Sequence, residues 1–336
     1  MRVAINGLGR IGKLSLRALL DRAGPVEVVL LNDPAGSPEI HAHLLEFDSV
    51  QGRWQAGIGH DDGGLTVRGR RMRLTHEKRI EDLPLREAKV DLVLDCTGVF
   101  RTVAKIEPYF SAGVGRVLVS APVKEEAALN LVYGVNHDLY DPARHRIVTA
   151  ASCTTNCLAP VVKVLHEEIG IRHGAITTVH DVTNTQVMVD RPMTDLRRAR
   201  SGLASLIPTT TGSATAITVI YPELKGRLNG HAVRVPLLNA SLTDCVFEMA
   251  RETSVDEVNG LFRDWAEGRL KGILGFEERP LVSADYRGDP RSAIVDGPST
   301  MVVAGTQVKV FAWYDNEWGY ANRMADLAEM IAARAS

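Results

Sequence analysis

The stretch Val3-Ala4-Ile5-Asn6-Gly7-Leu8-Gly9-Arg10-Ile11-Gly12 decides the fold of the first part of the chain. A short apolar run leads into a Gly-x-Gly-x-x-Gly turn, and residues 13–20 then carry apolar side chains at helical spacing. Residues 26–31 have the composition of a second buried strand, and Asp33 follows about 20 residues after the last glycine. The glycine pattern alone is a weak signal. Here the pattern lies between a strand and a helix, and a second strand follows, so it predicts a βαβ unit that binds a dinucleotide.

Each residue of this motif has a separate physical task. Gly7 permits the tight turn, Gly9 lets the backbone approach a pyrophosphate, and Gly12 lets the helix pack closely on the strand. The helix N-terminus offers N–H groups to the anion. Asp33 would accept hydrogen bonds from the adenosine ribose and repel a 2′-phosphate, which favours NAD over NADP. The alternative is a glycine-rich turn beside a solvated acid.

Two later apolar runs, residues 90–98 and 116–122, end in small and polar residues. Such runs are typical of parallel strands buried on both faces, whose C-terminal ends line the cofactor crevice. Thr97, Gly98 and Ser120 are therefore candidate cofactor contacts. Turns at strand ends also use these residue types for purely structural reasons.

The segment Ala-Ser-Cys-Thr-Thr-Asn-Cys at residues 151–157 precedes the apolar run 158–162, which predicts a loop entering a helix. A thiol at a helix N-terminus feels the positive end of the backbone dipole, so Cys153 is a candidate nucleophile. The alternative is a small buried residue, as most cysteines are. A β-type run at 176–179 ends at His180, which could supply a general base.

Hydroxyl and guanidinium groups cluster in the second half of the chain. Thr183 and Thr185 alternate along a segment that we expect to be extended, so both should face the same way. A basic run spans 196–200, four of the five residues at 209–213 carry hydroxyl groups, and Arg234 follows. A solvated loop explains any one of these, whereas the whole set predicts a phosphorylated substrate.

Composition limits the partners. The chain of 336 residues is long enough for two domains with well-developed cores. Its 45% hydrophobic and 24% charged residues are the balance of an ordinary globular protein. A net charge of -2 gives no bulk attraction to nucleic acid or to a membrane surface. Four cysteines are too few for a disulfide framework, and no apolar run could span a bilayer, so we expect a cytoplasmic protein. We expect no signal peptide and no metal site.

Taken together, five motifs closely resemble glyceraldehyde-3-phosphate dehydrogenase of the phosphorylating type. They are residues 5–12, 32–34, 151–157, 224–230 and 313–317, and the resemblance covers essentially the whole chain. It implies an α/β protein whose N-terminal Rossmann domain, with a doubly wound parallel sheet, spans 1–152 and is completed by a C-terminal helix at 317–336. An α+β catalytic domain with a mixed or antiparallel sheet would span 153–316. It also implies a homotetramer with subunit contacts around 181–203.

The resemblance assigns roles residue by residue. Cys153 would be the nucleophile and His180 its base. The positions that fall where the family contacts NAD are Arg10, Ile11, Asp33, Lys78, Ser120 and Asn316, the last as a partner for the nicotinamide amide. Thr183, Thr185 and Arg234 fall where the family holds the substrate 3-phosphate. Ser152, Thr154, Arg198, Thr211 and Gly212 fall where it holds the attacking inorganic anion. The basic run at 196–200 also occurs in members that accept NADP, so NADP stays open.

Several positions depart from the common glycolytic pattern. They include Asp181, Val123, Leu237-Leu238 and the segment 44–54. These variants look like the subfamily associated with arsenic resistance, which implies arsenate as the attacking anion and 1-arseno-3-phosphoglycerate as product. The alternative is inorganic phosphate and an ordinary glycolytic or gluconeogenic role. Strand alternation would place Asp181 on the opposite face from His180, so we expect it to serve a neighbouring loop at least as readily as to act on His180.

Two rival functions remain. An aspartate-semialdehyde dehydrogenase also pairs a Rossmann domain with Cys and His, but it would lack the paired anion sites. A non-catalytic NAD-binding redox sensor would use Cys153 and Cys157 and would need no substrate-phosphate site.

Overall fold

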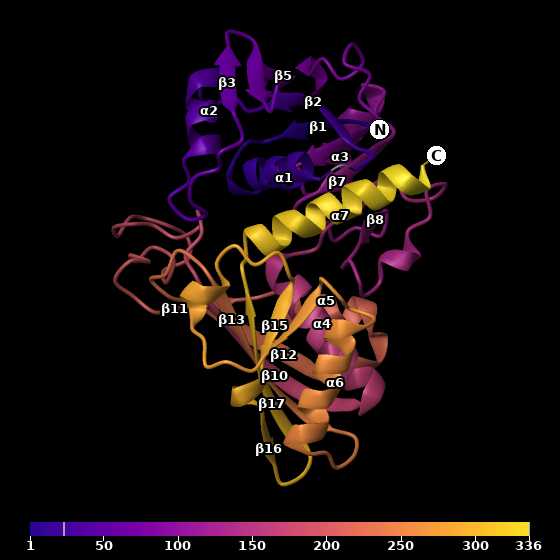
Figure 1. Cartoon of the computed structure of the whole chain (residues 1–336), viewed down its shortest axis with the longest axis vertical. Helices are drawn as coiled ribbons and strands as arrows, with labels where there is room; N and C mark the ends of the chain where they lie inside the picture. Colours follow the sequence, from indigo (N-terminus) through magenta and orange to yellow (C-terminus); the bar gives the residue numbers. More distant parts are fainter. Residues whose placement is uncertain (23, 336) are drawn as a thin grey trace. The chain divides into compact units, whose positions relative to one another are not determined.

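The computed structural model describes residues 1–22 and 24–335, which form two compact units. The first unit contains residues 1–133, 137–152 and 321–336, and the second contains 134–136 and 153–320. In Figure 1, where colour follows the sequence, the first unit combines the indigo N-terminal strands with most of the yellow C-terminal helix. No helix in the described ranges is both long enough and apolar enough to cross a membrane.

The first unit is built on a largely parallel sheet. Its strands are β1 (Arg2–Asn6), β2 (Glu27–Asn32), β3 (Ile58–Asp61), β4 (Gly64–Val67), β5 (Arg70–Thr75), β6 (Leu92–Asp95), β7 (Arg116–Val119), β8 (Ala128–Asn130) and β9 (Ile147–Thr149). They are ordered β3-β4-β5-β2-β1-β6-β7-β9-β8. Neighbours from β5 to β8 are parallel, whereas β3, β4 and β5 pair antiparallel. The predicted Rossmann sheet is confirmed.

The register of the parallel strands aligns their C-terminal ends. Asn6, the last residue of β1, lies beside both Asn32 of β2 and Asp95 of β6. Asn32 in turn pairs with Thr75, and Asp95 pairs with Val119. The segments that follow these strands therefore emerge along one edge of the sheet, where α/β proteins bind their ligands.

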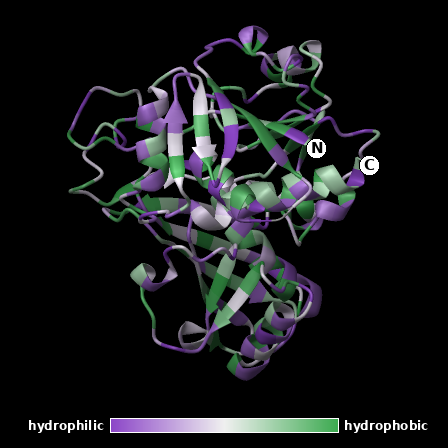
Figure 2. Cartoon of the chain, turned by 45° about the horizontal axis from the view of Figure 1, so that its top comes forward, coloured by the Kyte–Doolittle hydropathy of each residue, from purple (hydrophilic) through white to green (hydrophobic). Residues whose placement is uncertain are grey.

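Helices cover this sheet with their apolar sides. They are α1 (Arg10–Asp21), α2 (Pro38–Glu46), α3 (Val103–Ser111) and α7 (Trp318–Arg334), with short 3₁₀ turns η1 (Ile80–Asp82) and η2 (His137–Leu139). α1 buries Leu14, Leu16 and Leu19, whose spacing the sequence predicted. The hydropathy colouring of Figure 2 shows how polar and apolar residues mix along these elements. Arg22 holds α7 in the first unit by a contact with Asp326 at 2.7 Å.

The second unit has a mixed sheet. Its strands are β10 (Ile171–His180), β11 (Ile207–Thr210), β12 (Leu228–Arg234), β13 (Ser241–Met249), β14 (Leu274–Glu277), β15 (Ala293–Asp296), β16 (Met301–Val303) and β17 (Gln307–Tyr314). The order is β11-β12-β10-β13-β17-β15-β14, with β16 paired to β17. Its helices are α4 (Cys153–Glu168), α5 (Ser213–Ile220) and α6 (Val255–Glu267), with 3₁₀ turns η3 (Pro222–Leu224), η4 (Ser283–Tyr286) and η5 (Gly297–Ser299). The predicted α+β character is confirmed.

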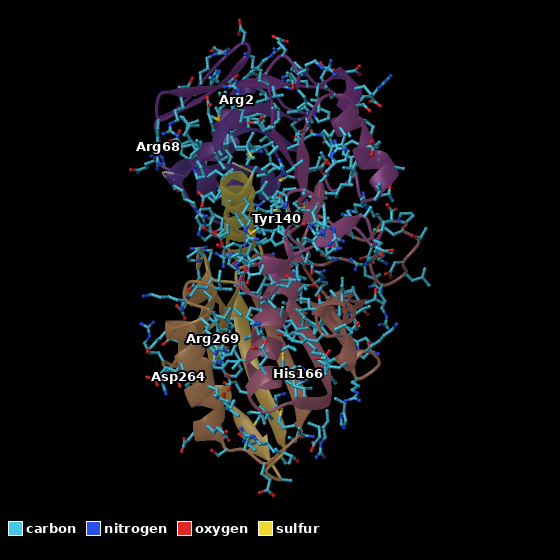
Figure 3. The ribbon with its side chains drawn as sticks, turned by 90° about the vertical axis from the view of Figure 1, so that its right-hand side faces the viewer. Arg2, Arg68, Tyr140, His166, Asp264 and Arg269 are labelled. Atoms are coloured by element: carbon cyan, nitrogen blue, oxygen red, sulfur yellow. The ribbon has the colours of Figure 1, made fainter. Side chains whose placement is uncertain are left out.

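Burial separates core from surface in both units. β13 alternates buried and half-buried residues along its whole length, as a strand with one face on the core does. α4 buries nearly all of its first three turns, including Leu158, Val161 and Leu165. Of the side chains labelled in Figure 3, Tyr140 is buried, whereas Asp264 and other charged groups are exposed. α4 and β10 are thus fixed by the core, and their ends carry the site.

Candidate active site

Cys153 and His180 meet at the ends of two core elements of the second unit. Cys153 is the first residue of α4, and His180 is the last residue of β10. The Cys153 Sγ lies 3.8 Å from the His180 Nε2, within reach of a hydrogen bond to sulfur. Cys153 is half-buried, whereas His180 is only 3% exposed. A thiol at a helix N-terminus beside an imidazole is the arrangement that generates a thiolate.

Electrostatics single out Cys153 among the four cysteines. Burial opposes its ionisation, but the hydrogen bond and charge of His180 prevail and hold the pKa of Cys153 below its usual value. Burial raises the pKa of Cys96 and of Cys157 to about 12, and it raises the pKa of Cys245 well above the usual value of a thiol. Three thiols therefore stay protonated at neutral pH, and Cys153 is the thiol that ionises most readily.

The other nitrogen of His180 faces Asp181. His180 Nδ1 lies 2.8 Å from Asp181 Oδ1 and 2.9 Å from the backbone oxygen of the same residue. The Asp181 side chain is fully buried. The expectation that alternation would separate the two side chains is wrong, because β10 ends at His180 and Asp181 lies outside the strand.

This contact changes the titration of both groups. Burial disfavours charge on His180, but the hydrogen bonds to Asp181 and Cys153 outweigh it and raise the pKa of His180 to about 9. Burial raises the pKa of Asp181 above its usual value, and the hydrogen bond and charge of His180 oppose that rise. The imidazole is thus more basic than an ordinary histidine.

Arg234 and Tyr314 complete the surroundings of His180. Parallel pairing of β10 with β12 sets Arg234 beside His180, and the Arg234 Nη1 donates to the Asp181 backbone oxygen at 3.2 Å. Its Nε is buried and has no hydrogen-bond partner among the described residues. The Tyr314 ring meets the His180 ring edge to face, with centroids 6.1 Å apart. A partly satisfied guanidinium next to the thiol suits an anionic ligand.

Thr183 and Thr185 are brought together, but not along an extended segment as predicted. Residues 184 and 185 form a turn, closed by a hydrogen bond from the Gln186 N–H to the Thr183 backbone oxygen at 2.9 Å. The two hydroxyl groups meet at 2.9 Å across this turn. Arg198 Nη1 donates to the Thr185 hydroxyl at 3.1 Å, so these three groups form one polar cluster.

The remaining anion candidates lie at helix starts. Gly212 precedes α5 without a capping side chain, and the Thr211 hydroxyl donates to the Ser213 hydroxyl at 3.1 Å. Thr154 lies in the first turn of α4, and its hydroxyl is 2.9 Å from the Tyr314 hydroxyl. Ser152 is the last residue of the first unit before Cys153.

The glycines of the first unit fit a dinucleotide. Gly7 has φ +93°, and a Cβ there would lie 2.7 Å from the Thr97 nitrogen. A Cβ on Gly12 would collide with the Gly7 backbone oxygen, so strand and helix touch there. At Gly9, nothing in the described chain lies within 4 Å of the Cβ position. Gly9 therefore borders open space at the N-terminus of α1, where a pyrophosphate would bind.

Other cofactor candidates follow the aligned strand ends. Asp33 comes directly after β2, and its carboxylate accepts the Leu8 N–H at 2.8 Å and the Ala35 N–H at 3.0 Å. Lys78 is exposed beyond β5. The rest lie close by in the chain: Thr97 and Gly98 after β6, Ser120 after β7, and Arg10 and Ile11 in the first turn of α1. Asn316 belongs to the second unit, where its Oδ1 accepts from Asn239 Nδ2 at 3.4 Å.

Comparisons with known proteins agree with this geometry. Residues 1–103 match the model of the glyceraldehyde 3-phosphate dehydrogenase NAD binding domain, and residues 152–316 match that of its C-terminal domain. The chain is 59% identical over 333 residues to glyceraldehyde-3-phosphate dehydrogenase 3 of Nostoc sp., covering 99% of this chain and 98% of that protein. The chain belongs to the glyceraldehyde-3-phosphate dehydrogenase family. It is also 49% identical to the Pseudomonas aeruginosa enzyme over 99% of this chain and 98% of that one. The Geobacillus stearothermophilus enzyme is 48% identical, with 99% of each chain covered.

Family membership confirms the expectation of an NAD-dependent dehydrogenase. It excludes the aspartate-semialdehyde dehydrogenase alternative. The redox-sensor alternative is physically disfavoured, because Cys157 is fully buried one helical turn after Cys153 and its thiol lies 3.8 Å from the Ala312 backbone oxygen. Burial keeps this second thiol protonated.

The sequence did not predict a buried polar network that lies at the C-terminal ends of β1, β2 and β6, next to the expected cofactor site. The Tyr109 hydroxyl accepts from Asn6 Nδ2 at 2.6 Å and donates to Asp95 Oδ2 at 2.7 Å. Asn32 Nδ2 donates to Asn6 Oδ1 at 2.8 Å. These residues tie together the ends of β1, β2 and β6. Nothing local in the sequence signals the network, since its members come from distant segments.

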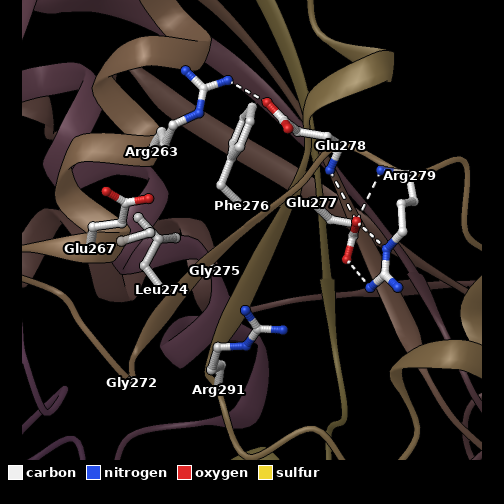
Figure 4. A pocket seen from close by; sticks show the side chains of 11 residues that line it. Arg263, Glu267, Gly272, Leu274, Gly275, Phe276, Glu277, Glu278, Arg279 and Arg291 are labelled. Carbon is white, nitrogen blue, oxygen red and sulfur yellow. Dashed lines mark hydrogen bonds and ion pairs between the residues drawn. The ribbon is translucent and has the colours of Figure 1, made fainter.

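The chain also has a groove away from Cys153, beside α6 and β14 (Figure 4). Most of its charged side chains are paired, Arg263 with Glu278 at 2.5 Å, Arg279 with Glu277 at 2.8 Å, and Arg291 with Asp289 at 2.6 Å. Because these charges are mutually neutralised, the groove offers little to a charged ligand.

Proposed function

We propose that the chain oxidises glyceraldehyde 3-phosphate through a thioester on Cys153, which an inorganic oxyanion then cleaves. The observation that carries this proposal is the 3.8 Å contact between Cys153 Sγ and His180 Nε2, combined with a lowered pKa for this thiol alone. A selective thiolate next to a basic imidazole is what covalent aldehyde oxidation requires.

The chain's own groups account for the proton transfers. The Cys153 thiolate attacks the aldehyde carbon, and the imidazolium of His180 gives its proton to the resulting alkoxide. His180 then takes the hydroxyl proton back as the thiohemiacetal is oxidised to the thioester. The oxyanion attacks the acyl carbon, the carbon–sulfur bond breaks, and Cys153 is released as thiolate.

Backbone and cofactor supply the other requirements. The Cys153 N–H at the start of α4 and His180 Nε2 are the donors that would stabilise negative charge on the substrate oxygen. NAD, held by the glycine turn and Asp33, supplies the hydride acceptor when bound. Because the Asp33 carboxylate is fixed by two backbone N–H groups, it can receive the ribose hydroxyls in a set geometry and would repel a 2′-phosphate.

Two anion sites serve the substrate and the attacking oxyanion. Thr183, Thr185 and Arg234 would hold the 3-phosphate. Ser152, Thr154, Arg198, Thr211 and Gly212 would hold the inorganic anion. The departures at Asp181, Val123 and Leu237-Leu238 support arsenate as that anion, with 1-arseno-3-phosphoglycerate as product, and phosphate is the alternative.

The decisive assay measures NADH formation from glyceraldehyde 3-phosphate, with phosphate and arsenate compared side by side. Cys153→Ser should abolish NADH formation, and substantial residual activity would refute the thioester. His180→Asn should lower turnover by about 10²–10⁴-fold, the usual contribution of a positioned general base, while leaving NAD binding unchanged. A higher kcat/KM with phosphate than with arsenate would contradict the arsenate role.

We further propose a homotetramer, supported by the apolar side chains that the loop after β10 exposes. Met188, Val189 and Leu196 are 73%, 75% and 82% exposed, which is unusual for neighbouring apolar groups on a monomer. Light scattering should give four times the chain mass. Val189→Asp and Leu196→Asp should dissociate the assembly, and a monomeric parent would refute it.

A further inference from the structure

Asp181, His180 and Cys153 form a continuous line of contacts. Asp181 Oδ1 lies 2.8 Å from His180 Nδ1, and His180 Nε2 lies 3.8 Å from Cys153 Sγ. The two nitrogens of one imidazole therefore face a carboxylate and a thiol. The line starts in the turn after β10 and ends at the N-terminus of α4.

We propose that Asp181 is a positioning residue that completes a Cys–His–Asp triad and keeps His180 charged until the base is needed. This inference rests on the function proposed above. Asp181 touches no substrate in this scheme and acts only through the imidazole.

His180 is the cation that pairs directly with the Asp181 carboxylate, whereas Arg234 acts on it only through its charge and contacts the backbone oxygen of the same residue. Among the described residues, His180 is the one side chain within ion-pair distance of Asp181, and no other donor reaches either of the buried carboxylate oxygens. Burying an unpaired carboxylate is costly in free energy, so the folded state is stabilised most when His180 is protonated and pairs with Asp181. The charge state of the imidazole and the burial of Asp181 are thereby linked.

Orientation of the ring alone does not require this carboxylate. The Asp181 backbone oxygen lies 2.9 Å from Nδ1 and would fix the same tautomer with any residue at the position. The side chain therefore adds charge rather than tautomer control. This separates the present triad from one in which removal of the acid releases the wrong tautomer.

The charged and titratable groups that surround His180 come from several elements. They are Cys153 from α4, Arg234 from β12, Tyr314 from β17 and Glu317 after β17. Arg234 opposes protonation of His180 and favours ionisation of Asp181, whereas the Cys153 thiolate favours the imidazolium. Glu317 disfavours ionisation of Asp181. Asp181 lies closer to the imidazole than the Cys153 sulfur does, at 2.8 Å against 3.8 Å.

A negative charge at Asp181 raises the pH at which both members of the Cys153–His180 pair lose their protons. It favours the imidazolium directly, and it also disfavours the Cys153 thiolate by repulsion. Removing this charge should therefore move both limbs of a pH profile in the same direction, to lower pH. An opposite charge within about 4–6 Å typically shifts a pKa by about 1–3 units.

The test compares Asp181→Asn with the parent and with Asp244→Asn in the full-length protein. Asp244 lies in the same sheet and pairs with Lys309 at 2.7 Å, so its substitution also removes one ion pair. The readouts are kcat against pH and the rate of Cys153 alkylation by iodoacetamide against pH. The expected result is a shift of about 1–3 units to lower pH for Asp181→Asn alone, with the KM for glyceraldehyde 3-phosphate nearly unchanged.

Coincident profiles for all three proteins would overturn the triad. Asp181→Ser provides a second variant should the Asn form fold poorly, and it must show the same shift. If Cys153→Ser retains activity, the proposed function fails. If Cys153→Ser is inactive and the Asp181→Asn profile is unchanged, only the triad fails.

Discussion

Removing the Tyr109 hydroxyl tests whether the network beneath the cofactor edge stabilises the first unit. Tyr109 is fully buried in the core cluster, and its ring meets Phe100 edge to face at 6.2 Å. Tyr109→Phe keeps this packing and removes one oxygen. The perturbation is therefore confined to the two hydrogen bonds to Asn6 and Asp95.

The magnitude follows from what the substitution leaves behind. Asn6 is 4% exposed and Asp95 is 1% exposed, so neither can recruit bulk water. Each buried group left without its partner costs about 1–3 kcal/mol, which gives about 2–6 kcal/mol for the pair. In a unit of this size, each kcal/mol lowers the melting temperature by about 2–4 °C. We expect a fall of at least about 4 °C.

The assay is differential scanning calorimetry at one scan rate, with Tyr286→Phe as matched control. Tyr286 is 2% exposed and stacks on Trp313 at 5.3 Å, and its hydroxyl has no hydrogen-bond partner among the described residues. Its loss should be nearly neutral. Equal melting temperatures for the two variants would refute the reasoning. Tyr109→Phe should also weaken NAD binding, because Asn6 and Asp95 immediately precede the cofactor turns.

Other substitutions test the cofactor turn and an ion pair beside it. Gly9→Ala should keep the parent melting temperature, because no atom of the described chain lies within 4 Å of the added Cβ. The same Cβ would occupy the space expected for the pyrophosphate, so NAD binding measured by calorimetry should weaken about tenfold or more, a loss of about 1.4 kcal/mol. Gly12→Ala should lose both stability and NAD binding, because its Cβ collides with Gly7; equal stability of the two variants would contradict this distinction. Burial works against ionisation of Asp48, but the hydrogen bond from Arg10 and two backbone N–H groups prevail and lower its pKa. Its stabilising contribution is therefore complete above the unfolded value of about 3.9 and is lost as pH falls through the lowered folded value. Asp48→Asn should lower the free energy of unfolding by about 1 kcal/mol at neutral pH, a modest loss because Arg10 is partly exposed. It should also flatten the acid side of a plot of melting temperature against pH. A plot parallel to that of the parent would contradict a stabilising Asp48–Arg10 pair.

Local patterns were sufficient to predict the elements that carry the chemistry. The glycine turn predicted β1, α1 and β2 in order, because strand, turn and helix signals are all encoded within one short segment. The small polar residues around Cys153 likewise predicted the start of α4. These predictions succeed because each depends on neighbours in sequence.

Features that depend on where an element stops, or on distant partners, were missed. Alternation failed for Asp181 because β10 ends one residue earlier. Thr183 and Thr185 lie on a turn for the same reason. Tyr109 could not be linked to Asp95 from sequence, since a helix and a strand must first pack before their polar groups meet.

The placement of residues 321–336 in the first unit has a consequence for synthesis on the ribosome. Arg22 of the first unit contacts Asn322 at 2.8 Å and Asp326 at 2.7 Å, on a helix that is translated only after all of the second unit. Domains generally fold in the order in which they emerge. Here the nascent first unit lacks α7 until translation ends, so the surface around Arg22 that packs against this helix stays exposed until then. The second unit can therefore finish folding before the first.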